Sequence, residues 1–112
     1  MAVLSVKLKK EFDLLYKKGR PLSGVLFSLR SLQVKVDEPT RFGIVISTKI
    51  SKKAVERNNK RRQIKEIITS LKERLSKGHL ILITLKDPGL TADYKALEGE
   101  LLSLFKKIGA VK

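Results

Sequence analysis

Patterns of apolar and turn residues along the chain predict a small α+β protein or a split α/β sandwich. Three stretches carry apolar residues at the spacing of amphipathic helices, and shorter β-branched and aromatic stretches lie between them. The 112 residues suit one domain, and no repeat, low-complexity run or flexible linker divides them. We therefore expect a single domain over residues 1–112, in the order helix, two or three strands, helix, strand, helix.

The N-terminal part is predicted to begin with a helix over residues 5–18. Leu8, Phe12 and Leu15 recur there at the spacing of one helical face. The helix is expected to end at the sequence Gly19-Arg20-Pro21, because glycine and proline interrupt helical patterns.

Extended chain is predicted next, over residues 25–36. Apolar residues alternate along it, and the alternation changes phase around Arg30, which predicts a bulge or a twist. A turn is expected at residues 37–40. Residues 42–46 are then predicted to form an antiparallel partner strand.

The second half of the chain is predicted to hold two helices with a strand between them. The first helix spans residues 52–76, with Ser51 as its N-cap. Residues 79–85 form a short apolar strand that we expect to be buried on both faces, and residues 86–89 form a loop. Thr91 is expected to cap the last helix, whose core-facing positions are Tyr94, Leu97, Leu101, Leu104, Phe105 and Ile108.

The net charge points to a polyanionic partner. Lysine and arginine number 25 against 11 acidic residues, which gives a formal net charge of +14. Residues 49–77 alone contribute +8 of this excess. Because so strong a field attracts nucleic acid, we expect an RNA or DNA partner. A membrane is not expected, since the longest apolar run, Leu80 to Ile83, is far shorter than the roughly 20 residues that span a bilayer.

Several kinds of chemistry are excluded by composition. The chain has no cysteine, which excludes thiol chemistry and fits a reducing, cytoplasmic location, and its start lacks the pattern of a secretory signal. The single histidine, His79, opens an apolar strand without a second metal ligand, and we interpret it as structural. No nucleotide-binding or nucleophile-elbow motif and no suitable carboxylate pair occurs. We therefore expect neither a catalytic residue nor a metal site.

The basic stretch is predicted to lie along one flank of the second helix. On a helical wheel, Arg57 falls on the apolar stripe, and Arg61 and Lys65 lie beside it. Because an unpaired buried guanidinium is costly, the first turns are expected to overhang the edge of the core. An ordinary solvated basic face is the alternative, but few acids alternate with these bases. The stripe itself consists of Ile64, Ile67, Ile68, Leu71 and Leu75.

Phe12, Tyr16 and Phe27 are the aromatic residues of the first 40 positions. If they share a face beside the basic helix, they form a stacking platform next to phosphate-binding groups, as single-stranded RNA or DNA requires. Taken one at a time, each of them is more commonly a core residue.

Two linked segments carry a family pattern. Residues 41–49 read RFGIVISTK, and residues 53–66 read KAVERNNKRRQIKE. With LKKEF at 8–12 and YKKG at 16–19, they resemble the protein component of bacterial ribonuclease P over nearly the whole chain.

This resemblance implies an α-β-β-β-α-β-α sandwich with a left-handed crossover around the second helix. It also implies an accessory subunit of an endoribonuclease, in which a catalytic RNA removes the 5′ leader from precursor tRNA by hydrolysis. The chemistry is then expected in the RNA subunit, with Mg²⁺ bound there and no cofactor bound by the protein alone. One monomer of the protein is expected in the holoenzyme.

The resemblance further implies two binding surfaces. The helix surface is expected to bind RNA through Arg57, Asn58, Arg61, Arg62 and Lys65, and we add Lys49, Lys52, Lys53 and Lys60 of the same basic stretch. A cleft between the first helix and the sheet is expected to hold the single-stranded leader, lined by Phe12, Tyr16, Phe27, Val45 and Ser47. Arg30 stands where an aromatic residue is common in the family, and we expect it to hold the leader by charge.

Two other functions fit the composition. A structural RNA-binding protein of ribosomal type shares the size and the charge, and co-purification with ribosomes would favour it. An independent nuclease is the third alternative, which RNA cleavage by the purified protein alone would support.

Overall fold

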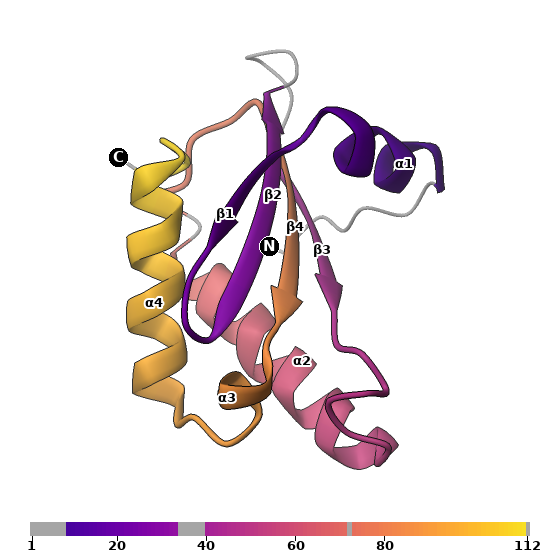
Figure 1. Cartoon of the computed structure of the whole chain (residues 1–112). Coiled ribbons are helices and arrows are strands. Elements are labelled where there is room, and N and C mark those ends of the chain that lie inside the picture. Colours follow the sequence, from indigo (N-terminus) through magenta and orange to yellow (C-terminus); the bar gives the residue numbers. More distant parts are fainter. Residues whose placement is uncertain (1–8, 34–39, 72, 112) are drawn as a thin grey trace.

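A computed structural model of the chain describes residues 9–33, 40–71 and 73–111, with side chains from Asp13 onward (Figure 1). The helices are α1 (Lys9–Lys18), α2 (Ala54–Ser70), the short α3 (Asp87–Leu90) and α4 (Tyr94–Lys107). The strands are β1 (Arg20–Ser23), β2 (Phe27–Gln33), β3 (Arg41–Val45) and β4 (His79–Leu85). The first predicted helix is confirmed over residues 9–18, and its predicted residues 5–8 lie outside the described residues. The predicted extended residues 34–36 and most of the turn after them lie outside as well.

β4 occupies the interior of the sheet, whose strand order is β1-β2-β4-β3. It pairs antiparallel with β2 and parallel with β3. The prediction that residues 42–46 pair antiparallel with the strand before them is therefore wrong. β4 is apolar and buried over almost its whole length, and a strand of this kind is found with neighbours on both sides.

The connection from β3 to β4 is a crossover through α2. Neighbouring parallel strands need a crossover connection, because the chain must return to the end of the sheet at which the first strand began. In Figure 1 both arrows point down, β4 lies to the left of β3, and α2 passes behind the sheet. This arrangement gives the left-handed sense that the resemblance implied, whereas most such connections are right-handed.

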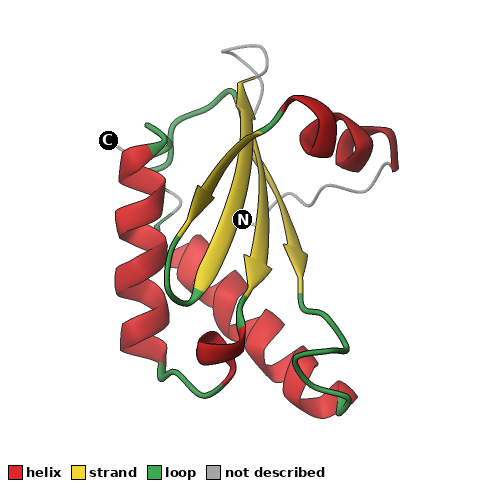
Figure 2. Ribbon diagram, in the orientation of Figure 1, coloured by secondary structure: helices red, strands yellow, loops and turns green. Residues whose placement is uncertain are grey.

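The two faces of the sheet carry separate apolar clusters. On one face, α2 and α4 cover the main core, which includes Phe27 and Phe42. On the other face, Leu15 of α1 packs on Leu80 and Leu82 of β4. Figure 2 shows α1 standing apart from the other helices. One side of the sheet is therefore closed, and the other is covered by α1 at one end.

β2 contains no bulge at Arg30, because its ladder with β4 is continuous over residues 27–33. The change of phase in the sequence instead marks a change of face. Leu29 points into the main core, while Leu32 packs beside Leu15 on the opposite face. A strand covered on both sides shows this pattern with a regular backbone.

α2 is shorter than predicted. Lys53, rather than Ser51, holds its N-cap position, and the Ser51 hydroxyl accepts from the Lys53 backbone N–H at 3.2 Å and donates to Glu56 at 2.7 Å. The helix ends at Ser70, and Leu75 lies beyond it, half-buried. The predicted stripe is confirmed in the buried residues Ile64, Ile67, Ile68 and Leu71.

The start of α4 also differs from the prediction. Asp93, not Thr91, is the N-cap, and its carboxylate accepts from the backbone N–H of Ala96 at 2.9 Å. Tyr94 is 36% exposed and does not face the core, because it lies in the first turn. The predicted loop at 86–89 contains α3. The predicted core face is otherwise confirmed in Leu97, Leu101, Leu104 and Phe105, with Ile108 packed against them.

β1 and β2 form a hairpin. The sequence patterns predicted only a helix end at residues 19–21 and extended chain from residue 25, so they missed β1. Val25, predicted to lie in a strand, is exposed in the turn. The Glu100 carboxylate of α4 accepts from the backbone N–H groups of Val25, Leu26 and Phe27 at 3.0, 2.7 and 2.8 Å. A turn held by so distant a residue has no local signature in the sequence.

Candidate nucleic-acid interface

The sheet face that carries α1 is only partly covered. Register places Ser28, Thr84 and Val45 side by side across β2, β4 and β3 on this face. All three are half-buried, whereas Leu82 in the next row is buried under Leu15. We call the row of Ser28, Thr84 and Val45, with Arg30 beside it, the open face.

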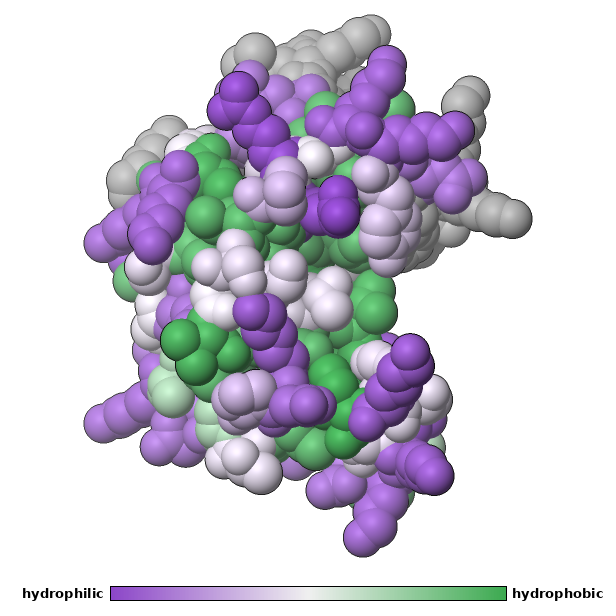
Figure 3. All heavy atoms as spheres, viewed as in Figure 1, coloured by the Kyte–Doolittle hydropathy of each residue, from purple (hydrophilic) through white to green (hydrophobic). Residues whose placement is uncertain are grey.

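Two basic elements, α1 with Lys17 and Lys18 and the start of α2, border the sheet on the side of β3. In Figure 3 the outline is hollowed between the end formed by α1 and the end formed by the start of α2. Hydrophilic side chains gather at both ends. An extended polyanion lying across the sheet would therefore meet positive charge on both sides.

Tyr16 and Arg30 form a planar pair at the edge of the open face. The Arg30 guanidinium lies 5.6 Å from the centre of the Tyr16 ring, within the range of a cation–π contact. It also donates a 3.4 Å hydrogen bond to the Tyr16 backbone carbonyl. Because the Tyr16 side chain is 55% exposed, part of its ring is free to stack on a nucleobase.

Ser47 lies just after β3 and shapes the loop that leads to α2. Its carbonyl accepts from the backbone N–H of Ile50 at 3.1 Å, and its hydroxyl accepts from the backbone N–H of Lys49 at 3.1 Å. The Lys49 side chain in this turn is exposed. Ser47 therefore fixes the backbone of the loop that carries Lys49.

Phe27 does not belong to the leader cleft. Its side chain is fully buried in the main core, on the face of the sheet opposite to α1. Phe27 and Leu29 are two residues apart on β2, so both side chains point to the same face, toward α4 and α2. The expectation that it stacks on RNA is therefore wrong, while the side chain of Phe12 lies outside the described residues.

The basic residues around the start of α2 are mostly available to a ligand. Arg57 and Arg61 are half-buried, and the Arg57 guanidinium donates to the Ser51 carbonyl at 2.9 Å. This contact gives the guanidinium a partner, and Figure 1 shows the first turns of α2 extending beyond the ends of the strands, as the helical wheel predicted. The exposed members are Lys49, Lys52, Lys53, Asn58, Arg62 and Lys65. We call these eight residues the α2 basic surface.

The hydrogen bonds of this surface leave its charge uncompensated. Arg61 donates to the amide oxygen of Asn58 at 3.4 Å, and Arg62 donates to that of Asn59 at 2.9 Å. Within the described part of the chain, both guanidinium groups thus meet neutral oxygens. These contacts hold the two side chains along the helix without reducing their attraction for phosphate.

Lys60 is not part of the α2 basic surface, although it lies in the same run of basic residues and was expected to bind RNA with them. It is only 9% exposed, and its ammonium donates to the Ala92 carbonyl at 2.7 Å and to Gln63 at 3.3 Å. It precedes the buried Ile64 by one helical turn, and this spacing is the signal that predicts its burial.

Residues 3–109 match the family model for ribonuclease P. The chain belongs to the ribonuclease P protein family. The ribonuclease P protein component of Synechocystis sp. is 30% identical over 108 residues, which cover 96% of this chain and 87% of the relative. That of Synechococcus elongatus is 38% identical over 91 residues, which cover 79% and 74%.

Solved structures of ribonuclease P proteins share this fold. The Staphylococcus aureus RNase P protein superposes with a TM-score of 0.87 at 23% identity, covering 98% of this chain and 99% of that one. The RNase P protein from Thermotoga maritima superposes with a TM-score of 0.83 at 26% identity, covering 92% and 96%. The small α+β fold with its mixed four-stranded sheet is thus the fold of the family.

This ribonuclease P protein is the protein subunit of a ribonucleoprotein endoribonuclease, and it acts with the RNA subunit in 5′ processing of precursor tRNA. The family assignment decides against a ribosomal-type protein. Among the described residues, no group of three His, Cys, Asp or Glu side chains is placed to hold a metal ion, and no helix is long and apolar enough to cross a membrane.

Proposed function

We propose that the open face binds the single-stranded 5′ leader of precursor tRNA, and that the α2 basic surface binds the RNA subunit. The Tyr16–Arg30 pair is the observation that carries the first half of this proposal. A phenol ring and a guanidinium are both planar groups on which a nucleobase stacks, and Arg30 also attracts the leader backbone.

The floor of the open face supports a leader of unspecified sequence. Ser28 and Thr84 offer small hydroxyl groups, and Val45 offers a short apolar side chain. None of these forms the bidentate pair of donors or acceptors that distinguishes one base from another. Recognition by stacking and by backbone contacts tolerates any base, which suits a subunit that meets many precursor tRNAs.

The charge of the α2 basic surface supports a contact with folded RNA. Positively charged side chains on one side of a helix repel each other, and the phosphate groups of RNA would relieve this repulsion. Neutralising several phosphates also releases counterions, which makes such binding strong at low salt. Lys49 and Ser47 connect this surface with the open face, so the leader and the RNA subunit are held next to each other.

The metal chemistry of the reaction is assigned to the RNA subunit in this proposal. Mg²⁺ prefers oxygen ligands such as carboxylates and phosphates, whereas the α2 basic surface presents mainly ammonium and guanidinium groups and the open face contains no carboxylate. Bound to the RNA subunit, Mg²⁺ would supply the activation of the water that hydrolyses the phosphodiester bond. The protein contributes by holding the leader and the RNA in register.

We further propose that one monomer of the chain, folded as a single domain over residues 1–112, works in a cytoplasmic holoenzyme. The absence of cysteine supports a reducing compartment.

Binding of precursor tRNA and of mature tRNA by the holoenzyme tests the proposal. Addition of the protein to the RNA subunit should increase affinity for precursor tRNA much more than for mature tRNA, which lacks the leader. Cleavage at low Mg²⁺ should increase in parallel. An equal gain for both RNAs would show that the open face does not hold the leader.

A further inference from the structure

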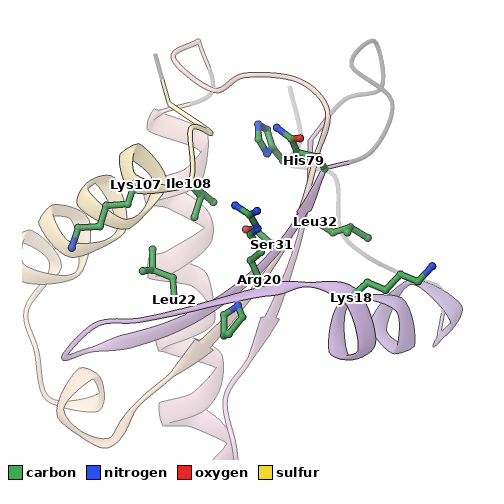
Figure 4. Close-up of a pocket in the computed structure, with 10 residues that line it drawn as sticks. Lys18, Arg20, Leu22, Ser31, Leu32, His79, Lys107 and Ile108 are labelled. Atoms are coloured by element: carbon green, nitrogen blue, oxygen red, sulfur yellow. The ribbon is translucent and has the colours of Figure 1, made fainter.

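A cavity separate from the open face lies mainly on the side of the sheet that α2 and α4 cover. It occupies about 510 Å³ between the hairpin of β1 and β2 and the C-terminal end of α4 (Figure 4). Figure 4 shows Arg20, Ser31 and His79 around its centre, with Leu22 to one side. Neither the open face nor the α2 basic surface contributes a residue to it.

Strand register brings the polar lining together. Arg20 of β1 lies opposite Ser31 of β2, and Gln33 of β2 lies opposite His79 of β4. Ser31 and Gln33 are two residues apart on one strand, so all four side chains emerge on the same face of the sheet. This constellation is a consequence of the pairing and not of neighbouring positions in the sequence.

Two of these polar side chains are buried without a partner. Ser31 is 9% exposed and His79 is 6% exposed, and both line the cavity. Within the described residues, neither the serine hydroxyl nor the imidazole forms a hydrogen bond with the protein, and the contact of His79 with Thr40, at 3.3 Å, is made by its backbone N–H. Buried polar groups are normally satisfied, so these two are available to a ligand.

The cavity is positively charged. Lys18, Arg20 and Lys107 line it, and none of its lining residues is acidic. In the described part of the chain, none of these three cations donates a side-chain hydrogen bond to the protein. The cavity thus combines fixed donors near its centre with flexible cations, which is the composition of an anion site.

We propose that this cavity binds a phosphate group, with Arg20 as its principal donor and Ser31, His79 and Lys107 as further contacts. An RNA backbone phosphate and a free phosphorylated small molecule offer the same chemistry to the site. Arg20, Ser31 and His79 emerge on the face of the sheet away from the open face, and no residue of the open face lines the cavity, so the two sites can be tested separately.

His79 makes the proposal measurable in the full chain, because it is the only histidine and its ring protons give isolated NMR signals. Inorganic phosphate should shift these signals in a saturable way, and sodium chloride at matched ionic strength should not. Arg20→Gln should weaken the apparent affinity about tenfold, the effect of losing one charge-assisted hydrogen bond.

Lys107→Gln and Lys106→Gln form a matched pair, since both residues are exposed and lie in the last turn of α4 but only Lys107 lines the cavity. Lys107→Gln should weaken phosphate binding about two- to fivefold, and Lys106→Gln should leave it unchanged. Equal effects of the two variants, or the absence of a saturable His79 shift, would overturn the proposal.

Addition of the RNA subunit then distinguishes the two phosphate sources. If the site takes an RNA phosphate, the RNA should shift the His79 signals and compete with inorganic phosphate. If phosphate shifts them and the RNA does not, the site takes a free phosphorylated molecule. Tyr16→Ala should leave phosphate binding unchanged, so this test can fail while the leader proposal stands, and the reverse is also true.

Discussion

The ammonium group of Lys60 lies 2.7 Å from the backbone carbonyl oxygen of Ala92. This contact connects α2 with the loop before α4. It also keeps the Lys60 ammonium away from solvent, whereas the other basic side chains of α2 are exposed or half-buried. The basic run of α2 therefore divides into the residues of the α2 basic surface, which we propose bind RNA, and one residue that contacts the fold.

Lys60→Met and Arg62→Met test this division. The first variant keeps an aliphatic stem but leaves the Ala92 carbonyl without its donor, so we expect it to lower the free energy of unfolding by about 1–2 kcal/mol. The slope of RNA affinity against salt should stay as in the wild type. Arg62→Met should change stability by less than about 0.5 kcal/mol and reduce the salt slope by about 1.

Urea unfolding and binding at several salt concentrations measure both quantities. If Lys60→Met reduces the salt slope as much as Arg62→Met does, Lys60 contacts RNA and the assignment to the fold is wrong.

Glu100→Gln should destabilise the β1–β2 hairpin. The carboxylate accepts from three backbone N–H groups of the turn, and an amide offers one oxygen in place of two and loses the charge. We expect a loss of about 2 kcal/mol in urea unfolding. Glu98→Gln on the same helix is the control, and equal losses in the two variants would mean that net charge, not the turn contact, causes the effect.

His79 should make stability depend on pH. Burial lowers the pKa of the imidazole from its ordinary value of 6.5. The unfolded chain therefore binds a proton at a pH where the folded protein does not, and the free energy of unfolding should decrease as pH falls below about 6.5. Above that pH the effect should vanish.

Unfolding of the wild type and of His79→Gln between pH 5 and 8 isolates this contribution, because the carboxylates titrate equally in both. Lys18, Arg20 and Lys107 are the charged groups that line the same cavity as His79. A wild-type curve parallel to that of the variant would contradict the prediction.

Local patterns predicted the helices well. The stripe of Ile64, Ile67, Ile68 and Leu71 identified the buried face of α2, and the position of Arg57 on that stripe predicted first turns that extend beyond the edge of the core. Periodicity is sufficient here because one helix packs one face against the core. The motif in residues 41–66 correctly indicated the family to which the chain belongs.

The arrangement of the sheet could not be predicted in the same way. The sequence of β2 does not show which of its apolar residues face α1, so Phe27 was expected in the cleft and lies in the core. β4 enters the sheet between β2 and β3 only after the crossover, and no local signal indicates this. The constellation of Arg20, Ser31 and His79 depends on that same pairing.

If the leader stacks on the open face beside Tyr16, as we propose, binding of precursor tRNA depends on the length of the leader. The most direct test is the affinity of the holoenzyme for precursor tRNAs of increasing leader length, with Tyr16→Ala compared with Tyr94→Ala. Tyr94 is the only other tyrosine and lies on α4, away from the open face.

Tyr16→Ala should lower affinity for long-leader substrates about tenfold, as the loss of one stacked base requires. It should have no effect on mature tRNA, and Tyr94→Ala should behave as the wild type. If Tyr16→Ala weakens binding of mature tRNA and of every precursor equally, the leader does not lie on the open face.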